Sequence, residues 1–422
     1  MTSTPQNQAL TQEQMMAFLQ SGNPSLSTVT PLQLLQTSMN MLMQAERNLH
    51  LEQNPHDKGN GYFKRQVGTP MGALALEVPR DRDGDFRPAI LPERYQRDYA
   101  QRSALLGSLM VNGYSPKKLQ HTLHELDLHY NPQEVEALKN HYLTLFTQWQ
   151  QRELPQDVIG IFIDAYHAET LIEQKVRKSV VYVIMGIDYT GHKSLYGIYL
   201  YQGHETKGFW LQTLNQLIHR GLKNPLFVVS DDFSGLKEAV ATLYPQALHQ
   251  LCFIHMQRNL YRNMAKPDAH AFNQTLMSLK CLNDKEQACT QFTTLCQTYQ
   301  KHYPAFMQAL QTKAEHYFAF LHLPTEVKKY FYTTNTVESF NSLLEKIRQQ
   351  MGGFFQSEDC LKVNVFLTLR RLTESKWTKG MPHVIAQLYP MRQLFAVRYG
   401  RLPLESQHIL PVENTKLKSA SK

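Results

Sequence analysis

Several features that would assign this chain to a special class are missing from its sequence. Its five cysteines show no paired C-x-x-C spacing, so we expect no disulfide framework and a reducing compartment. The N-terminal residues have no basic start followed by an apolar run, which argues against a secretory signal peptide. The longest apolar runs, such as VVYVIMGI at 180–187, have only the length of a strand. We therefore expect a soluble cytoplasmic protein with no membrane partner.

What the chain does contain is length, apolar residues and positive charge. Its 422 residues are 42% hydrophobic, which predicts two or three domains with a proper core. The formal net charge is +8, which favours a polyanionic partner such as nucleic acid. Charge alone is weak support for that partner, because many basic proteins bind no DNA.

The N-terminal third divides into three segments by composition. Residues 1–30 are polar and expected to be poorly ordered. Residues 31–98 begin with apolar residues at helical spacing and continue into a basic segment whose centre, ALALEV, alternates like a strand. Residues 99–150 read as two or three helices, two of them starting at Pro116 and Pro132. We interpret the last two segments as small helical DNA-binding modules.

The pattern changes to α/β after residue 150. Three β-rich runs are followed by helix, strand, helix and strand, and this is the element order of a ribonuclease-H-like mixed sheet. We assign 151–255 to the first part of that core and 256–328, which contains no strand pattern, to an all-α insertion domain. The core would resume over 329–380, and 381–422 would form a C-terminal tail.

Three acids fall at informative places on this map. Asp164 follows the buried run VIGIFI, and Asp231 follows PLFVVS. These strands are neighbours in a ribonuclease-H-like sheet, so both carboxylates would emerge at one edge. Glu338 opens the helix after the insertion and can reach the same place; its separation from Asp231, 338 − 231 = 107 residues, fits a core with a domain inserted.

Clustered carboxylates repel one another unless cations neutralise them. Oxygen ligands suit Mg²⁺ or Mn²⁺, and two such ions about 3.5–4 Å apart can serve phosphodiester displacement. For any one acid alone, a turn residue or helix cap is the simpler interpretation. Asp188 and Asp232 also follow apolar runs; we interpret Asp188 as a turn residue and expect Asp232 to point away from Asp231.

Several phrases together resemble one family. They are EVPRDRDGDFRP (77–88), FIDAY (162–166), VIMGIDYTGHKSLYGIYL (183–200), FWLQTLNQLIHRGLKNPLFVVSDDFSGL (209–236), CFIHMQRN (252–259) and YTTNTVESFN (332–341). The chain resembles the Mutator-like bacterial insertion-sequence transposases, a DDE family with a ribonuclease-H-like core. In that family the catalytic acids stand in D-A, S-D-G and T-N-x-x-E phrases, which correspond here to Asp164, Asp231 and Glu338.

The resemblance implies a metal-dependent enzyme that binds the terminal inverted repeats of its own element, cleaves there and transfers the strand to target DNA. It also implies two Mg²⁺ or Mn²⁺ ions per active site, a homodimer that brings two ends together, and association with the bacterial nucleoid. Two rival functions stay open: a DNA-binding, repressor-like relative without catalysis, and a ribonuclease-H-like nuclease without strand transfer.

Candidate DNA contacts come from several segments. Lys64, Arg65, Arg80 and Arg82 would clamp phosphates, although half of such charges are ordinarily solvated. Lys117 and Lys118 lie where the family has a helix-turn-helix, a segment that could instead serve packing or dimerisation. The remaining candidates are Arg258, for which a surface ion pair is an equal alternative, and Asn341, Lys346 and Arg348 on the glutamate helix. Thr333, Thr334 and Asn335 would cap and orient that helix.

Two further groups have competing interpretations. His249, Cys252 and His255 are compatible with a zinc site, but packing and hydrogen bonding fit their loose spacing better. The family usually carries tryptophan in the helical insertion, and this chain has none between Trp210 and Trp377. Tyr317, Phe318 and Phe320 could stack on DNA bases instead, with core packing as the preferred interpretation.

Overall fold

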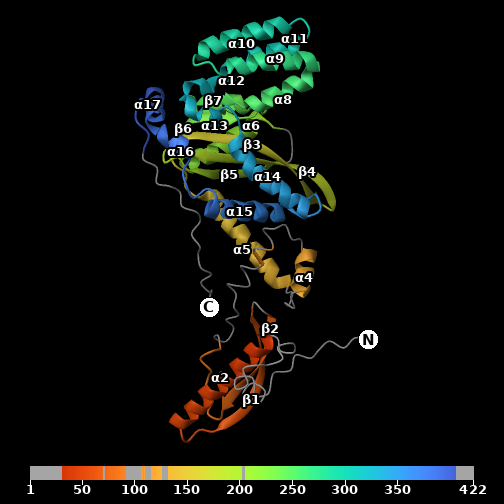
Figure 1. Cartoon of the computed structure of the whole chain (residues 1–422), viewed down its shortest axis with the longest axis vertical. Helices are drawn as coiled ribbons and strands as arrows, with labels where there is room; N and C mark the ends of the chain where they lie inside the picture. The colour runs from red at the N-terminus through yellow and green to blue at the C-terminus, as the bar shows by residue number, and fades with distance from the viewer. Residues whose placement is uncertain are drawn as a thin grey trace, which may run out of the picture. The chain divides into compact units, whose positions relative to one another are not determined.

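The computed structural model describes residues 31–69, 72–91, 106, 107, 109, 116–125, 132–201 and 205–404 (Figure 1). The chain forms two compact units, the first comprising Met1–Met110 and Tyr114–Leu138, the second Val111–Gly113 and Lys139–Lys422. The expectations for residues 1–30, and for the tail beyond residue 404, lie outside the described residues. In the described part of the chain, no helix combines the length and apolar character needed to cross a membrane.

The first unit is not purely helical, which corrects one expectation. Its described elements are α2 (Pro31–Gln53), β1 (Gly59–Thr69), β2 (Gly72–Asp81) and α4 (Pro116–Glu125). β1 and β2 form an antiparallel hairpin, and α2 packs against β2 through a core of Met43, Leu74, Leu76 and Val78. The alternation in ALALEV predicted β2, whereas β1 carries glycines and cations instead of alternating apolar residues, so its sequence gave no strand signal.

A five-stranded mixed sheet organises the second unit. Its strands are β3 (Asp157–Ile172), β4 (Lys175–Ile187), β5 (Lys193–Tyr201), β6 (Asn224–Ser230) and β7 (Leu248–Leu251). The order across the sheet is β5-β4-β3-β6-β7, with the first three strands antiparallel and β6 and β7 parallel to β3. β3 and β6 are therefore neighbours, as the sequence predicted.

β3 is longer than its apolar run. It pairs with β6 only from Asp157 to Ile163, then continues to Ile172 against β4, with one further bridge from Thr170 to Phe355. Tyr166, Ala168 and Thr170 remain buried along this extension, so its inward face is still covered. The apolar run VIGIFI ends before the extension begins, which is why the sequence placed the end of the strand too early.

Opposite faces of β3 are covered by different helices. Ile161 and Ile163 share a core with Trp210 of α6 (Lys207–His219) and with α7 (Leu236–Leu243). Phe162 instead packs on Phe331 of α13 (Thr325–Phe331), with ring centroids 5.4 Å apart. Because side chains alternate along a strand, the even-numbered position 164 also faces away from α6 and α7, toward α14 (Asn335–Gln350). This alternation positions Asp164 under the glutamate helix.

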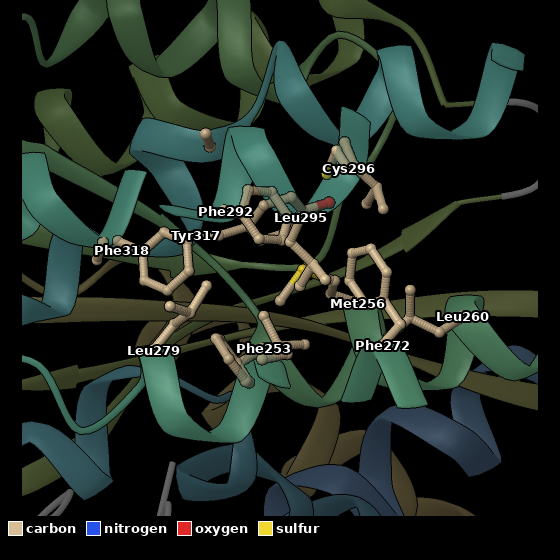
Figure 2. Packing of buried hydrophobic residues seen from close by; sticks show 14 of the residues in the cluster. Phe253, Met256, Leu260, Phe272, Leu279, Phe292, Leu295, Cys296, Tyr317 and Phe318 are labelled. Atoms are coloured by element: carbon tan, nitrogen blue, oxygen red, sulfur yellow. The ribbon is translucent and has the colours of Figure 1, made fainter. Parts of the chain in front are cut away.

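Helices alone occupy residues 253–331, as their sequence predicted. They are α8 (Phe253–Asn263), α9 (Lys266–Leu279), α10 (Lys285–Tyr299), α11 (Pro304–Gln311), α12 (Ala314–Tyr317), a short 3₁₀ helix (Ala319–His322) and α13. In Figure 1, α8 to α12 gather at one end of this unit, and α12 contacts β7. Figure 2 shows their shared core, in which Phe272, Phe292 and Phe318 meet. Tyr317, Phe318 and Phe320 are each at least 95% buried, which confirms packing over base stacking.

This helical core yields a stability prediction. Phe272→Ala removes a fully buried ring that contacts Phe292 and Tyr299, so we expect a loss of roughly 3–5 kcal/mol in unfolding free energy. The matched control is Met277→Ala on the same helix, a side chain that is 40% exposed and should change stability by less than about 0.5 kcal/mol. Urea denaturation measures both, and equal effects would contradict the assigned core.

Four more helices complete the described structure: α5 (Pro132–Gln151), α15 (Glu358–Ser375), α16 (Pro382–Ala386) and α17 (Leu388–Tyr399). α4 and α5 begin at the two prolines that predicted them. Beyond α17, Arg401 donates two hydrogen bonds to Asp157, of 2.6 and 2.8 Å, at the start of β3. Residues 382–404 are therefore structured against the sheet, where the sequence suggested only a tail.

Candidate active site

The strand register sets Asp164 and Asp231 side by side. The last paired residues of β3 and β6 are Ile163 and Ser230, and each acid is the next residue of its chain. Asp164 continues in β3, opposite Val183 of β4, and is 6% exposed. Asp231 leaves its strand at this point and is more accessible. The two adjacent strands therefore place both carboxylates at the end of the ladder that they share.

The glutamate helix is tied to this edge by a side-chain hydrogen bond. Asn341 of α14 donates from Nδ2 to Oδ2 of Asp164 over 2.8 Å. Glu338 lies three residues earlier, in the first turn, and residues three apart share one side of a helix. Its side chain is 43% exposed. The contact from Asn341 therefore turns the side of α14 that carries Glu338 toward Asp164.

A chain of polar contacts joins Asp231 to Glu338 through α8. His255 Nδ1 is hydrogen-bonded to Oδ1 of Asp231, and Arg258 Nη1 lies 2.9 Å from His255 Nε2. Arg258 Nη2 lies 3.7 Å from Oε1 of Glu338. Of the two interpretations of Arg258, the ion pair is the one observed. A cavity of about 190 Å³ adjoins this chain of contacts, with Asp231, Cys252 and His255 in its wall.

Burial makes the charges at this edge depend on one another. Burial, together with the negative charge of Asp231, raises the pKa of Asp164 to about 7. For His255, burial by itself would lower the pKa, but hydrogen bonds to Asp231 and Cys252 raise it to about 10. The site therefore holds carboxylates whose negative charge calls for nearby cations, and His255 supplies one of them.

Thr333 and Thr334, which precede α14, orient this helix by contacts that differ from the cap we expected. Thr334 is the N-cap residue but makes no side-chain cap bond; its hydroxyl faces Cys252 Sγ at 3.7 Å. Thr333 Oγ1 instead accepts the N–H of Asn335 over 3.1 Å. Both threonines are almost fully buried, so they anchor the start of α14 on Cys252, at the start of α8. Cys252 thus acts in packing between two site-bearing helices.

The zinc interpretation of His249 is wrong. Its Nε2 lies 2.9 Å from Ser230 Oγ, its ring packs against His316, and burial lowers its pKa to about 3. The group whose ligand atoms do lie within 4.8 Å of one another is Asp231, Cys252 and His255. His249 is therefore a packing residue, as the alternative interpretation predicted.

Asp188 and Asp232, the two other acids that follow apolar runs, behave as the sequence suggested. Asp188 Oδ1 accepts the backbone N–H groups of Thr190 and His192, at 2.8 and 3.1 Å, which is the bonding of a turn residue. Asp232 is exposed and paired with Lys313, not with Asp231 or its partners.

The acidic edge offers oxygen ligands suited to a divalent cation, although oxygens of all three acids do not lie within 4.8 Å of one another; Asp231 instead groups with Cys252 and His255. The ligands offered by Asp164, Asp231 and Glu338 are carboxylate oxygens, the donors that Mg²⁺ and Mn²⁺ prefer. Beside Asp164, the buried Oδ1 of Asn341 has no hydrogen-bond partner. An unsatisfied oxygen and a carboxylate with a raised pKa both indicate missing positive charge at this position.

The candidate DNA contacts in the first unit lie on or near its hairpin. Lys64 and Arg65 stand on β1, and Arg80 on β2, where its guanidinium covers the Phe63 ring at 4.5 Å. Arg82 follows β2 and, like Lys64, is exposed. On α4, Lys118 is exposed, whereas the side chain of Lys117 lies outside the described residues.

One candidate on α14 requires correction. Arg348 was expected to face DNA, but its guanidinium is bonded to Glu345, Glu169 and the carbonyl of Gly353. Hydrogen bonding to Glu345 raises the pKa of Arg348, and this network lowers the pKa of Glu345 to about 2. Arg348 therefore braces α14 against the β3 extension. Lys346, two residues earlier, is exposed.

Removing the Asn341 amide should weaken the site without unfolding it. We expect Asn341→Ala to lower activity by about 10–100-fold, the usual effect of losing a group that orients a metal ligand. The Mg²⁺ concentration needed for half-maximal activity should rise as well. Ser342→Ala, at an exposed neighbouring position, is the control and should leave both quantities unchanged. An unaltered Mg²⁺ requirement in Asn341→Ala would contradict this role.

Comparison with known proteins identifies the class. A transposase family model matches residues 2–380, which include the whole acidic edge. The chain belongs to that family, the Mutator family of transposases.

Individual relatives are insertion-sequence transposases. The chain is 29% identical over 333 residues to the transposase for insertion sequence element ISRM3 of Rhizobium meliloti (strain 1021), covering 78% of this chain and 82% of that protein. It is 26% identical over 337 residues to the IS905 transposase of Lactococcus lactis subsp. lactis (strain IL1403), covering 78% and 85%. With the transposase for IS256 in transposon Tn4001 of Staphylococcus aureus it shares 27% identity over 255 residues, covering 58% and 65%.

Proposed function

We propose that this protein is a DDE transposase that binds the terminal inverted repeats of an insertion sequence, cleaves the DNA there and transfers the strand. Its catalytic residues would be Asp164, Asp231 and Glu338. Membership of the Mutator family and the names of the relatives support the activity class. The net charge of +8 suits a DNA substrate.

One observation carries the residue assignment. The register that ends at Ile163 and Ser230 brings Asp164 and Asp231 to adjacent positions, and the hydrogen bond from Asn341 to Asp164 ties the helix of Glu338 to them. These contacts support a shared site for acids that stand far apart in the sequence.

The sheet order supports a ribonuclease-H-like core. Three antiparallel strands followed by two parallel ones, with α13 and α14 returning to the sheet after the helical segment, match the arrangement inferred from the sequence. In this proposal, α8 to α12 and the short 3₁₀ helix are an inserted domain. The unit with the β1–β2 hairpin would bind element ends through Lys64, Arg65, Arg80 and Arg82, and two copies of the chain would pair to hold two ends.

The three carboxylates would hold Mg²⁺ or Mn²⁺ ions. When bound, such ions supply activation of the attacking oxygen and stabilisation of the leaving oxygen in phosphodiester displacement. The protein's own residues prepare the site: Asn341 fixes the orientation of Asp164, and His255 and Arg258 give Asp231 and Glu338 positive partners. The side chains of His255 and Arg258 can turn to phosphate once the carboxylates have other partners. Arg258 is half-exposed, which leaves room for this movement.

The test is incubation of the purified full-length chain with Mg²⁺ and DNA that carries the terminal repeats flanking its gene. Cleavage followed by joining to a second DNA supports a transposase. Cleavage without joining would replace the proposal with a nuclease, and specific binding without cleavage would replace it with a repressor-like protein.

A further inference from the structure

A second cluster of potential metal ligands lies in the first unit, apart from the acidic edge of the sheet. It consists of His50 in the last turn of α2, Asp57 in the loop before β1, and Asp81 at the end of β2. One ligand atom from each lies within 4.8 Å of the others. His50 Nε2 is 3.7 Å from Asp57 Oδ2 and 4.0 Å from Asp81 Oδ2. The three segments that build this unit therefore converge at one point.

Both carboxylates are buried and held in fixed orientations. The side chains of Asp57 and Asp81 are 4% and 2% exposed. Each is held by backbone N–H groups: those of Lys58, Arg82 and Asp83 on Asp57 Oδ1, and those of Asp85 and Phe86 on Asp81 Oδ2. These bonds fix the carboxylates in the way that outer groups orient metal ligands.

One carboxylate oxygen in the cluster lacks a hydrogen-bond partner. Asp57 Oδ2 is fully buried and accepts no hydrogen bond, although it faces His50 and Asp81. A buried carboxylate oxygen without a donor costs free energy unless a cation satisfies it. Two carboxylates are buried here beside a single imidazole. A divalent ion would neutralise both carboxylates and bond to Asp57 Oδ2.

We propose that His50, Asp57 and Asp81 bind a divalent transition-metal ion such as Zn²⁺, which fastens α2 to the β1–β2 hairpin. One imidazole and two carboxylates are ligands that Zn²⁺ accepts, at bond lengths of about 2.0–2.2 Å. At these bond lengths two ligands of a tetrahedral ion lie about 3.3–3.6 Å apart, so the separations of 3.7 and 4.0 Å from His50 would have to shorten by a few tenths of an ångström on binding. The fourth position would be taken by water.

This site would be structural. His50 ends α2, while Asp57 and Asp81 flank the hairpin that carries Lys64 and Arg80. Metal binding stabilises whatever conformation brings the ligands together. The ion would therefore rigidify the hairpin, whether or not the unit binds DNA.

The test measures zinc per chain. Full-length protein is stripped with a chelator, dialysed against Zn²⁺ and analysed by inductively coupled plasma mass spectrometry. We expect Asp57→Asn to bind one zinc equivalent fewer than the unaltered protein. Asp83→Asn, in the neighbouring loop after β2 and with an exposed side chain, should bind as much as the unaltered protein. A loss in Asp57→Asn alone also separates this site from the group around Cys252, which both variants retain.

A second pair of variants, both at His50, tests the site even if Asp57→Asn fails to fold. His50 is 27% exposed, so its replacement should be tolerated. His50→Cys retains a zinc ligand but cannot act as an imidazolium between two acids, and His50→Gln retains neither function. Zinc kept in His50→Cys and lost in His50→Gln supports the site. Equal zinc in the unaltered protein, Asp57→Asn and His50→Gln would overturn it and leave a protonated histidine between two carboxylates.

Discussion

Asp231→Asn is expected to lower Mg²⁺-dependent cleavage of repeat-bearing DNA by roughly 10³-fold or more, because several kcal/mol of transition-state charge stabilisation would be lost. The substitution keeps the shape of the side chain and removes the charge that a cation needs. DNA binding should persist, since the basic hairpin of the first unit is untouched. Cleavage assays and electrophoretic mobility shifts measure the two properties separately.

The neighbouring acid provides the matched control. Asp232→Asn also removes one negative charge, one residue further along, but Asp232 is exposed and paired with Lys313. Its cleavage activity should stay within about threefold of the unaltered protein, as expected for a surface ion pair worth at most about 1 kcal/mol. Similar losses in both variants would mean that general charge, and not the position of Asp231 at the strand end, governs activity.

Asp164→Asn is expected to abolish cleavage while making the metal-free protein more stable. Asp164 is 6% exposed and lies beside Asp231, and burial together with that charge raises its pKa to about 7. Removing this buried negative charge beside Asp231 should increase the unfolding free energy by about 1–3 kcal/mol. Added Mg²⁺ should stabilise the unaltered protein and leave Asp164→Asn unchanged, which thermal denaturation can measure.

Another acid of the same strand should respond in the opposite direction. Asp157 is buried like Asp164, but it accepts two hydrogen bonds from Arg401 and one from the N–H of Leu404. Asp157→Asn should therefore destabilise the protein by roughly 2 kcal/mol, the range for losing charge-assisted hydrogen bonds. If both substitutions destabilised the metal-free protein to the same degree, Asp164 would be an ordinary paired acid and its assignment as a metal ligand would fail.

Local sequence signals predicted most of the elements. Proline at the first helical position located the starts of α4 and α5, and alternation of apolar residues located β2. The apolar run VIGIFI located β3 but not its full length, because the extension to Ile172 is stabilised by pairing with β4 and by burial under α14 and residues near Phe355. β1 gave no signal, since its glycines and cations are held in a strand by β2.

The candidate site was predictable only in part. Acids placed after apolar runs pointed to Asp164 and Asp231, and they did so because the polar residue after each run stands just beyond the last paired residues of β3 and β6. The same signal marked Asp188 and Asp232, which the sequence interpreted as a turn residue and as an acid pointing away from Asp231, and their contacts agree with that interpretation. The prediction that Arg348 faces DNA was wrong because helical spacing cannot reveal that Glu169, on a distant strand, bonds to its guanidinium.

By itself, the sequence determined which residues are buried, where most elements begin, and which acids are candidates, because these depend on periodicity and on nearest neighbours along the chain. Tertiary structure alone decided the partners: Asn341 on Asp164, His255 on Asp231, and His50 between Asp57 and Asp81. The physical reason is that charge interactions act over a few ångströms, whereas the residues that exert them stand tens or hundreds of positions apart.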